Sequence, residues 1–174
     1  MESQSVDALG ELAVVKRSPS FDDFYRAQFP KLVPLARALC GPAIADDIAQ
    51  EAMLATYRQW RKVGDLASPE AWARRTCANL AVSAFRRRVI EARALVRLGR
   101  SAPVGELSPD AEAFWSAVRS LPKRQAQAAA LRYLYDLSVA EVAETLGISL
   151  RAAERHWTWA KAWLFQWIRE QERK

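Results

Sequence analysis

Residues 138–149 read SVAEVAETLGIS, and the chain continues as LRAAERHWTWAKAWLFQWI over residues 150–168. This stretch predicts a short helix over 139–146, a turn at 147–149 and a longer helix from Leu150 onward. Gly147 can adopt the left-handed backbone conformation that such a turn needs, and Ser149 can cap the second helix. The size and spacing are those of a helix-turn-helix, whose second helix enters the DNA major groove.

A helical wheel divides that second helix into two faces. The core stripe is predicted to consist of Ala153, Trp157, Ala160 and Leu164. Arginine suits the O6/N7 edge of guanine, threonine can contact a base, and lysine can neutralise a phosphate. The opposite face therefore predicts a surface for DNA recognition, and an ordinary amphipathic helix is the alternative. The candidate DNA contacts on this face and its flanks are Arg151, Glu154, Arg155, Thr158 and Lys161.

The rest of the chain also predicts helices. Ala, Leu, Arg and Glu are abundant, and there is no sustained alternation of apolar and polar residues, so strands are not expected. Ser20, Ser68 and Ser108 stand where a side-chain oxygen can cap a helix, with Pro or an acidic residue in the first turn. We expect helices at about 21–39, 43–61, 69–90, 110–120 and 123–135, and hence an all-α fold.

Residues 99–109, GRSAPVGELSP, have the composition of a linker and divide the chain into two small helical domains. Residues 1–20 show no clear periodicity and are expected to form a loose tail. The predicted organisation is a first helical domain over 21–92, a flexible linker over 93–109, and a helix-turn-helix domain over 110–174.

Composition excludes several classes of protein. The 174 residues contain no apolar run near the roughly 18 residues of a membrane span, and no secretory signal, so we expect a cytoplasmic protein without membrane insertion. Cys40 and Cys77 lack the spacing of a metal site, and the single His156 is not near either, so both are expected to be buried thiols and no metal is expected. No nucleophile or phosphate-binding motif is present, which predicts neither an enzyme nor a cofactor.

The positive charge is concentrated in one stretch. Residues 74–100 hold eight basic residues and one acidic residue, a balance of +7 in a chain whose net charge is +6. Such a surplus suggests a polyanionic partner, with a solvated helix face as the alternative. Asn79 could bond a base edge while the arginines follow a nucleic-acid backbone, or the helix could be structural with a basic end. The candidate residues are Arg74, Arg75, Asn79, Arg86, Arg87 and Arg88.

The segment ADDIAQEAMLATYRQW, residues 45–60, predicts a surface of another kind. One side of its helix is small and apolar, whereas the other sets Leu54 and Tyr57 among polar groups. Apolar anchors ringed by polar side chains are typical of protein interfaces. We therefore predict a protein-docking surface, unless Leu54 and Tyr57 cover a neighbouring helix. Its candidate residues are Asp46, Asp47, Gln50, Leu54 and Tyr57.

At these residues the chain resembles a bacterial RNA polymerase sigma factor of the extracytoplasmic-function (ECF) type. Residues 45–51, ADDIAQE, are similar to the family's A-E-D-L-V-Q-E block, and 71–87 to its A-W-L and A-x-N-x-A-x-D-x-x-R-R pattern, with Ala73 in place of Leu and Ser83 in place of Asp. Residues 121–125, LPKRQ, resemble L-P-x-R-Q. Residues 131–149 and the ending AERHWTWAKAWL resemble the family's C-terminal blocks, so the likeness covers about 21–170 in order.

The resemblance implies two helical domains on a flexible linker and a role in promoter-specific transcription initiation. It implies that Asp47, Gln50 and Leu54 help bind core RNA polymerase, and that Asn79 and its neighbours recognise and melt the minus-ten promoter element. The minus-thirty-five element would be recognised by Glu154, Arg155 and Thr158. An anti-sigma factor is a further possible partner. A stand-alone helix-turn-helix regulator is the alternative hypothesis, and a recombinase or nuclease lacks the required cluster of carboxylates.

Overall fold

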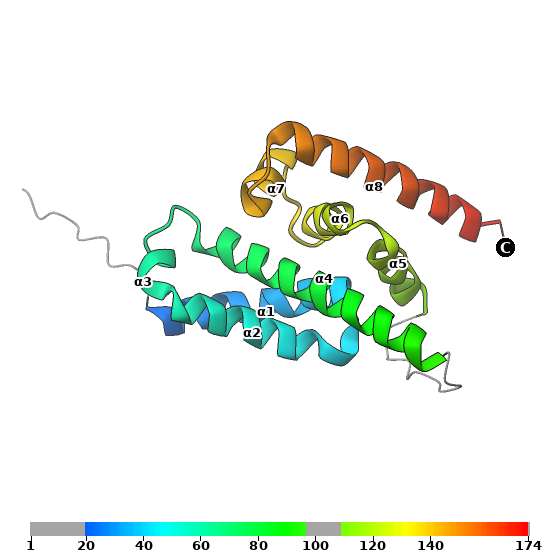
Figure 1. Cartoon of the computed structure of the whole chain (residues 1–174). Helices are drawn as coiled ribbons and strands as arrows, with labels where there is room; N and C mark the ends of the chain where they lie inside the picture. Colours follow the sequence, from blue (N-terminus) through cyan, green and yellow to red (C-terminus); the bar gives the residue numbers. More distant parts are fainter. Residues whose placement is uncertain (1–19, 97–108, 174) are drawn as a thin grey trace, which may run out of the picture.

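The computed structural model describes residues 20–96 and 109–173, and every regular element among them is a helix (Figure 1). The all-α prediction is confirmed. The predicted tail and most of the predicted linker lie outside the described residues. The elements in chain order are α1 (Phe21–Cys40), the 3₁₀ turn η1 (Pro42–Ile44), α2 (Ala45–Arg58), α3 (Trp60–Val63), α4 (Pro69–Val96), α5 (Pro109–Ser120), α6 (Lys123–Tyr135), α7 (Val139–Leu146) and α8 (Leu150–Gln171).

Local sequence signals place most helix starts. The Ser20 hydroxyl accepts a hydrogen bond from the Asp23 amide at 3.2 Å, and Ser68 Oγ accepts one from the Ala71 amide at 3.2 Å. The predicted cap at Ser108 lies outside the described residues. Two predicted bounds were wrong. The helix expected over 69–90 runs on to Val96, because residues 91–96 are good helix formers without Gly or Pro, and the one expected over 43–61 is divided into η1, α2 and α3.

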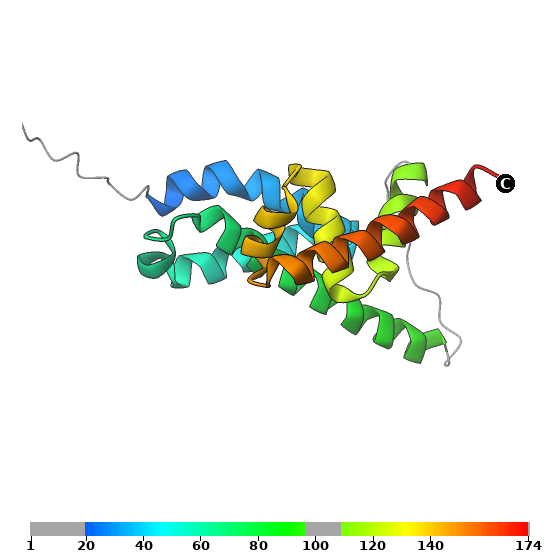
Figure 2. The ribbon, with the colours of Figure 1, turned by 90° about the horizontal axis from the view of Figure 1, so that it is seen from above.

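Helices α1, α2 and α4 pack around one another and, with α3, form what we call the N-terminal unit. Its core consists of large side chains from α1, among them Leu35 and Leu39, against small ones from α2 and α4, such as Ala49 and Ala81. Helices α5 to α8 form the C-terminal unit around Leu131, Leu146 and Leu164. Two perpendicular views place the C-terminal unit directly against the N-terminal unit, with α8 on its outer side (Figures 1 and 2).

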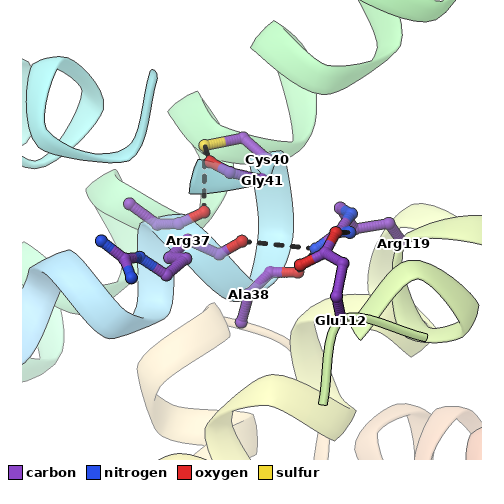
Figure 3. A network of polar contacts seen from close by, with 7 residues as sticks. Arg37, Ala38, Cys40, Gly41, Glu112 and Arg119 are labelled. Carbon is purple, nitrogen blue, oxygen red and sulfur yellow. Dashed lines mark hydrogen bonds and ion pairs between the residues drawn. The ribbon is translucent and has the colours of Figure 1, made fainter. Parts of the chain in front are cut away.

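The two units share one continuous core, because the cluster of buried apolar residues runs from α1 through α4 into α5, α6, α7 and α8. Arg119 of α5 reinforces this junction (Figure 3). Its guanidinium pairs with Glu112 and donates hydrogen bonds to the Arg37 and Ala38 carbonyl oxygens at 3.4 and 3.3 Å. The Arg37 carbonyl also accepts the backbone hydrogen bond of Gly41 at 2.9 Å, so Arg119 adds a second donor there and supplies a donor to Ala38 in the last turn of α1, where carbonyls lack intrahelical partners.

Cys40 and Cys77 are free, buried thiols, as predicted. Burial raises the pKa of Cys40 to about 12 and also raises the pKa of Cys77. Among the described residues, no His, Cys, Asp and Glu side chains gather in a group of three able to hold a metal ion. Within the same residues, no helix combines the length and apolar character needed to cross a membrane.

Candidate functional site

The helix-turn-helix forms where the sequence places it. Ser138 and Glu141 make a reciprocal capping box at the start of α7, in which Ser138 Oγ accepts from the Glu141 amide and Glu141 Oε2 accepts from the Ser138 amide. These bonds lower the pKa of Glu141. Gly147 ends α7 with φ of 62°, in the left-handed region, and Ser149 Oγ then caps α8. The turn thus fixes the direction in which α8 leaves α7.

Helix α8 buries the predicted stripe and exposes the predicted face. Ala153, Ala160 and Leu164 are fully buried, and Trp157 is partly buried beneath the guanidinium of Arg132, 5.0 Å from its ring centre. Trp159 is 65% exposed and lies beside the candidate DNA contacts. We call these contacts the α8 recognition face, and all of its members are exposed: Arg151, Glu154, Arg155, Thr158 and Lys161.

His156 lies at the edge of the α8 recognition face and was not among the residues predicted for DNA contact. Its pKa is lowered, chiefly because it is partly buried and further by the positive charges of Arg155 and Arg124. The same like-charge effect acts on Lys123, whose pKa is lowered by burial, by Arg124 and by Arg86. Lys123 and Arg124 at the start of α6 thus lie near enough to Arg86 of α4 and to His156 of α8 to influence their electrostatics.

A groove of about 670 Å³ lies between α1 and α2 and contains most of the predicted docking residues. Leu54 and Tyr57 are 47% and 59% exposed, so they are not covered by a neighbouring helix. Asp46 is exposed but lies outside the groove. We call this site the α1–α2 groove, and it is lined by Phe21, Asp22, Tyr25, Asp47, Gln50, Glu51, Met53, Leu54 and Tyr57.

The α1 side of this groove was missed by the sequence analysis. The ring of Phe21 lies 4.9 Å from that of Tyr57, and Tyr25 is exposed beside it. Exposed aromatic residues in the first turns of α1 were a usable signal, but the sequence alone does not say that this end of α1 lies beside α2.

The structure places the candidate residues of α4 in three settings. Arg86 and Arg87 are exposed near the C-terminal end of the helix. Arg74 and Asn79 are half-buried against the C-terminal unit, where the Asn79 side-chain oxygen accepts a hydrogen bond from Gln127 Nε2 at 3.0 Å. Arg75 reaches toward Gly147 of that unit and is itself exposed. Arg88 lines a cavity of about 340 Å³ between the two units.

The α1–α2 groove, the candidate residues of α4 and the α8 recognition face thus occupy separate elements of one molecule. Acidic, amide and apolar groups line the first, whereas arginines dominate the second and basic residues are the largest group on the third.

Comparison with known proteins agrees with these features. The family model for ECF sigma factors matches residues 107–170, and the model for sigma-70 region 2 matches residues 24–89. The RNA polymerase sigma-E factor of Streptomyces coelicolor is 27% identical over 132 residues, which are 74% of this chain and 75% of that protein.

Two solved structures have the same fold. One is the sigma factor RpoE in complex with the anti-sigma factor NepR from Bartonella quintana, with a TM-score of 0.68, 18% identity, and coverage of 86% of this chain and 96% of that one. The other is CnrH in complex with the cytosolic domain of CnrY, with a TM-score of 0.60, 21% identity, and coverage of 86% and 88%. Since two sigma-factor models match in order along both helical units, the chain belongs to the extracytoplasmic-function sigma factors, which direct RNA polymerase to specific promoters.

Proposed function

We propose that this sigma factor divides its work among three surfaces. The α1–α2 groove and the neighbouring Asp46 bind core RNA polymerase. Helix α4 contacts the minus-ten element through Arg74, Arg75, Asn79 and the arginines at 86–88. The α8 recognition face contacts the minus-thirty-five element. In this proposal the N-terminal unit, which includes α4, takes the role of the predicted domain over 21–92, and the C-terminal unit takes that of the domain over 110–174.

The exposure of Leu54 and Tyr57 in a ready-formed groove is the observation that carries this proposal. Large apolar side chains held in a concave site and bordered by Asp47 and Gln50 offer a partner both apolar anchors and polar selectivity. A regulator that binds only DNA does not require a protein-binding groove of this kind. The stand-alone regulator is therefore the weaker alternative, and the comparisons do not favour it.

The two basic surfaces support contact with DNA at two separate elements. Arg155 and Thr158 project from the exposed side of α8, and Arg86 and Arg87 project from α4. Arginine can form bidentate bonds to guanine or to phosphate, so each surface combines base recognition with backbone binding.

Three further properties belong to the same proposal. The protein acts in the cytoplasm, where it carries out no bond chemistry of its own and requires no cofactor. An anti-sigma factor holds it inactive, since the similar RpoE and CnrH structures are both complexes with a partner protein and the RpoE partner is an anti-sigma factor.

Capture of core RNA polymerase followed by transcription from a promoter library tests the proposal. The wild-type chain should bind the core enzyme and direct initiation at a defined set of promoters. Leu54→Ala should weaken capture by roughly tenfold, the usual size of an interface anchor effect. Leu66→Ala is the matched control, because Leu66 is also 47% exposed but lies outside the groove. Specific binding to DNA without any capture of polymerase would support the stand-alone regulator instead.

A further inference from the structure

One large aromatic side chain stands among the candidate DNA contacts of α8. Trp159 directly follows Thr158, lies one helical turn after Arg155, and is 65% exposed. Within the described parts of the chain, its indole makes no side-chain hydrogen bond and no contact with another ring or with a cation. Trp159 therefore presents an uncovered apolar surface on the solvent side of the helix.

The other aromatic residues of α8 differ from Trp159 in their surroundings. Trp157 and Trp167 are partly buried against the core, and the ring of Trp157 lies 5.7 Å from that of Tyr133. Phe165 is exposed, but the guanidinium of Arg169 lies 5.9 Å from its ring centre. All seven tryptophans lie in the described residues, and Trp159 is the most exposed of them.

Helix geometry places Trp159 beside Arg155. Four residues along an α-helix correspond to a rotation of about 40° and a rise of about 6 Å, so the two side chains leave the helix in nearly the same direction. Trp163 lies a further 40° or so round the helix, toward the packed side, and is less exposed at 41%. A molecule bound against Arg155 is thus within reach of Trp159 but is directed away from Trp163.

The charges around Trp159 favour a nucleic acid over a protein as the molecule that covers it. Arg151, Arg155 and Lys161 share the α8 recognition face, and its acidic member, Glu154, is turned about 140° round the helix from Trp159. The exposed apolar residues of the α1–α2 groove lie instead among carboxylates. Cations attract the phosphates of DNA, which bring the base edges to the same side of α8.

The major groove offers one apolar group to an indole. Thymine carries a C5-methyl group there, whereas the other bases present hydrogen-bond donors and acceptors. Arg155 suits guanine, and Thr158 can bond either kind of edge. A flat apolar ring beside them adds recognition of a thymine, because burying its methyl group against the ring removes apolar surface of both from water.

We propose that Trp159 is a specificity-determining residue whose indole packs on the C5-methyl group of a thymine in the minus-thirty-five element. This inference deepens the proposed function and rests on the proposed role of the α8 recognition face. It assigns one position of the element to thymine, next to the position that Arg155 contacts.

A scan with deoxyuridine tests the contact at the level of the methyl group. The probe is the strongest promoter recovered from the library, with each thymine of its minus-thirty-five element replaced singly by deoxyuridine, which lacks only the methyl group. The wild-type holoenzyme should bind one of these duplexes roughly fourfold more weakly, the equivalent of one buried methyl group. In Trp159→Ala that replacement should have no effect, since the partner of the methyl group is gone.

Trp163→Ala is the matched control, because it removes the same side chain from an exposed position one turn further along α8. It should keep the full fourfold effect of the deoxyuridine replacement. Urea denaturation of the free variants should match the wild type, since an exposed indole adds little to the core. Trp159→Phe provides a second variant, which retains a flat apolar ring and should keep a smaller deoxyuridine effect.

An element without a thymine whose methyl group matters to the wild type would overturn the contact, as would an equal loss in wild type and Trp159→Ala. Weaker capture of core polymerase by Trp159→Ala, without coupling to any methyl group, would place the indole in a protein interface instead. Arg155→Ala separates this inference from the proposed function. If it lowers discrimination between promoter and random duplex while no methyl coupling exists, only the role of Trp159 fails; if neither Arg155→Ala nor Trp159→Ala alters that discrimination, the α8 recognition face itself is wrongly assigned.

Discussion

Arg155 projects into solvent from the recognition helix between Glu154 and His156, with Thr158 close by on the same face. Its guanidinium is not engaged by any hydrogen bond or ion pair identified among the described residues, so it can meet a base edge without first breaking a contact. We expect Arg155→Ala to weaken binding of the polymerase holoenzyme to its promoter by about 1–3 kcal/mol while sparing unrelated DNA. Competition binding of promoter and random duplex to the holoenzyme measures this.

Lys161 is the matched comparison on the same helix. As a flexible point charge it is suited to phosphate, so Lys161→Ala should weaken promoter and random duplex equally and reduce the salt dependence of binding. An equal loss on both DNA molecules for Arg155→Ala would make Arg155 another phosphate contact and leave sequence recognition to Thr158 and Glu154.

His156 gives a second prediction at this scale. Its pKa is lowered by burial first, then by Arg155 and Arg124, so the unfolded chain binds a proton more readily than the folded one. The contribution of His156 to stability is therefore complete above its unfolded pKa and is lost as the pH falls through that value toward the lower folded pKa. Removing a neighbouring charge should reverse part of this shift.

We accordingly expect Arg155→Ala to raise the pKa of His156, observed as a shift in the NMR titration of its ring protons. Arg151→Ala is a control on the same face, because Arg151 is not among the groups that perturb His156. An unchanged titration in Arg155→Ala would show that burial and Arg124 account for the lowered pKa without Arg155.

At the scale of single helices, the capping box of α7 can be tested directly. Ser138→Ala removes the hydroxyl that caps α7 and should lower the free energy of unfolding by about 1 kcal/mol, as for other caps. It should also raise the pKa of Glu141, because the Ser138 bonds lower it. Urea denaturation and an NMR titration of Glu141 measure the two effects. Ser83→Ala, at an exposed mid-helix position of α4, should leave both values nearly unchanged.

The pH dependence that accompanies this box has a defined sign. The folded pKa of Glu141 lies below its ordinary value, so its stabilising contribution is present above that value and is lost as the pH falls through the folded pKa. The stability difference between the wild type and Ser138→Ala should therefore shrink in acid. A difference that grows on acidification would contradict the box.

The elements that the sequence predicted best are those defined by local chemistry. Ser138, Gly147 and Ser149 each act within four residues of their own position, so the helix-turn-helix could be placed to the residue. The α1–α2 groove could be only half predicted, because Leu54 and Tyr57 lie on one helix while Phe21 and Tyr25 lie on another. Periodicity identifies the side that a helix exposes but not which helix lies beside it.

At the scale of the whole molecule, the sequence indicated two domains and a linker but not their contact. Leu32, Leu35 and Leu39 fit the core of a small helical domain equally well whether or not a second domain covers it. Asn79 likewise is a residue type that often contacts DNA bases, but in the structure its side chain accepts a hydrogen bond from Gln127 of the other unit. The composition of a linker indicates how flexible the segment is, but it does not indicate whether the two domains that it connects pack against each other.

A shared core also predicts how the molecule unfolds. The N-terminal unit has 77 described residues and the C-terminal unit has 65. A helical unit of that size buries a modest fraction of its surface by itself. The apolar contacts across the interface and the bonds of Arg119 to the end of α1 therefore add stability to both units. In the wild-type chain, amide hydrogen exchange under increasing urea should place α1 and α6 in one cooperative transition.

Replacing Arg119 should divide that transition. Arg119→Met leaves the Glu112 carboxylate without its partner and removes the Arg119 bond to the Ala38 carbonyl, whereas the Arg37 carbonyl keeps its bond from the Gly41 amide. A loss of about 2–4 kcal/mol is typical for a partly buried pair broken in this way. Because Arg119 lies on α5, the C-terminal unit should lose protection at lower urea than the N-terminal unit. Arg87→Met, at an exposed arginine, should preserve the single transition. If the two units still exchange together in Arg119→Met, the shared apolar core couples them without the polar contacts of Arg119.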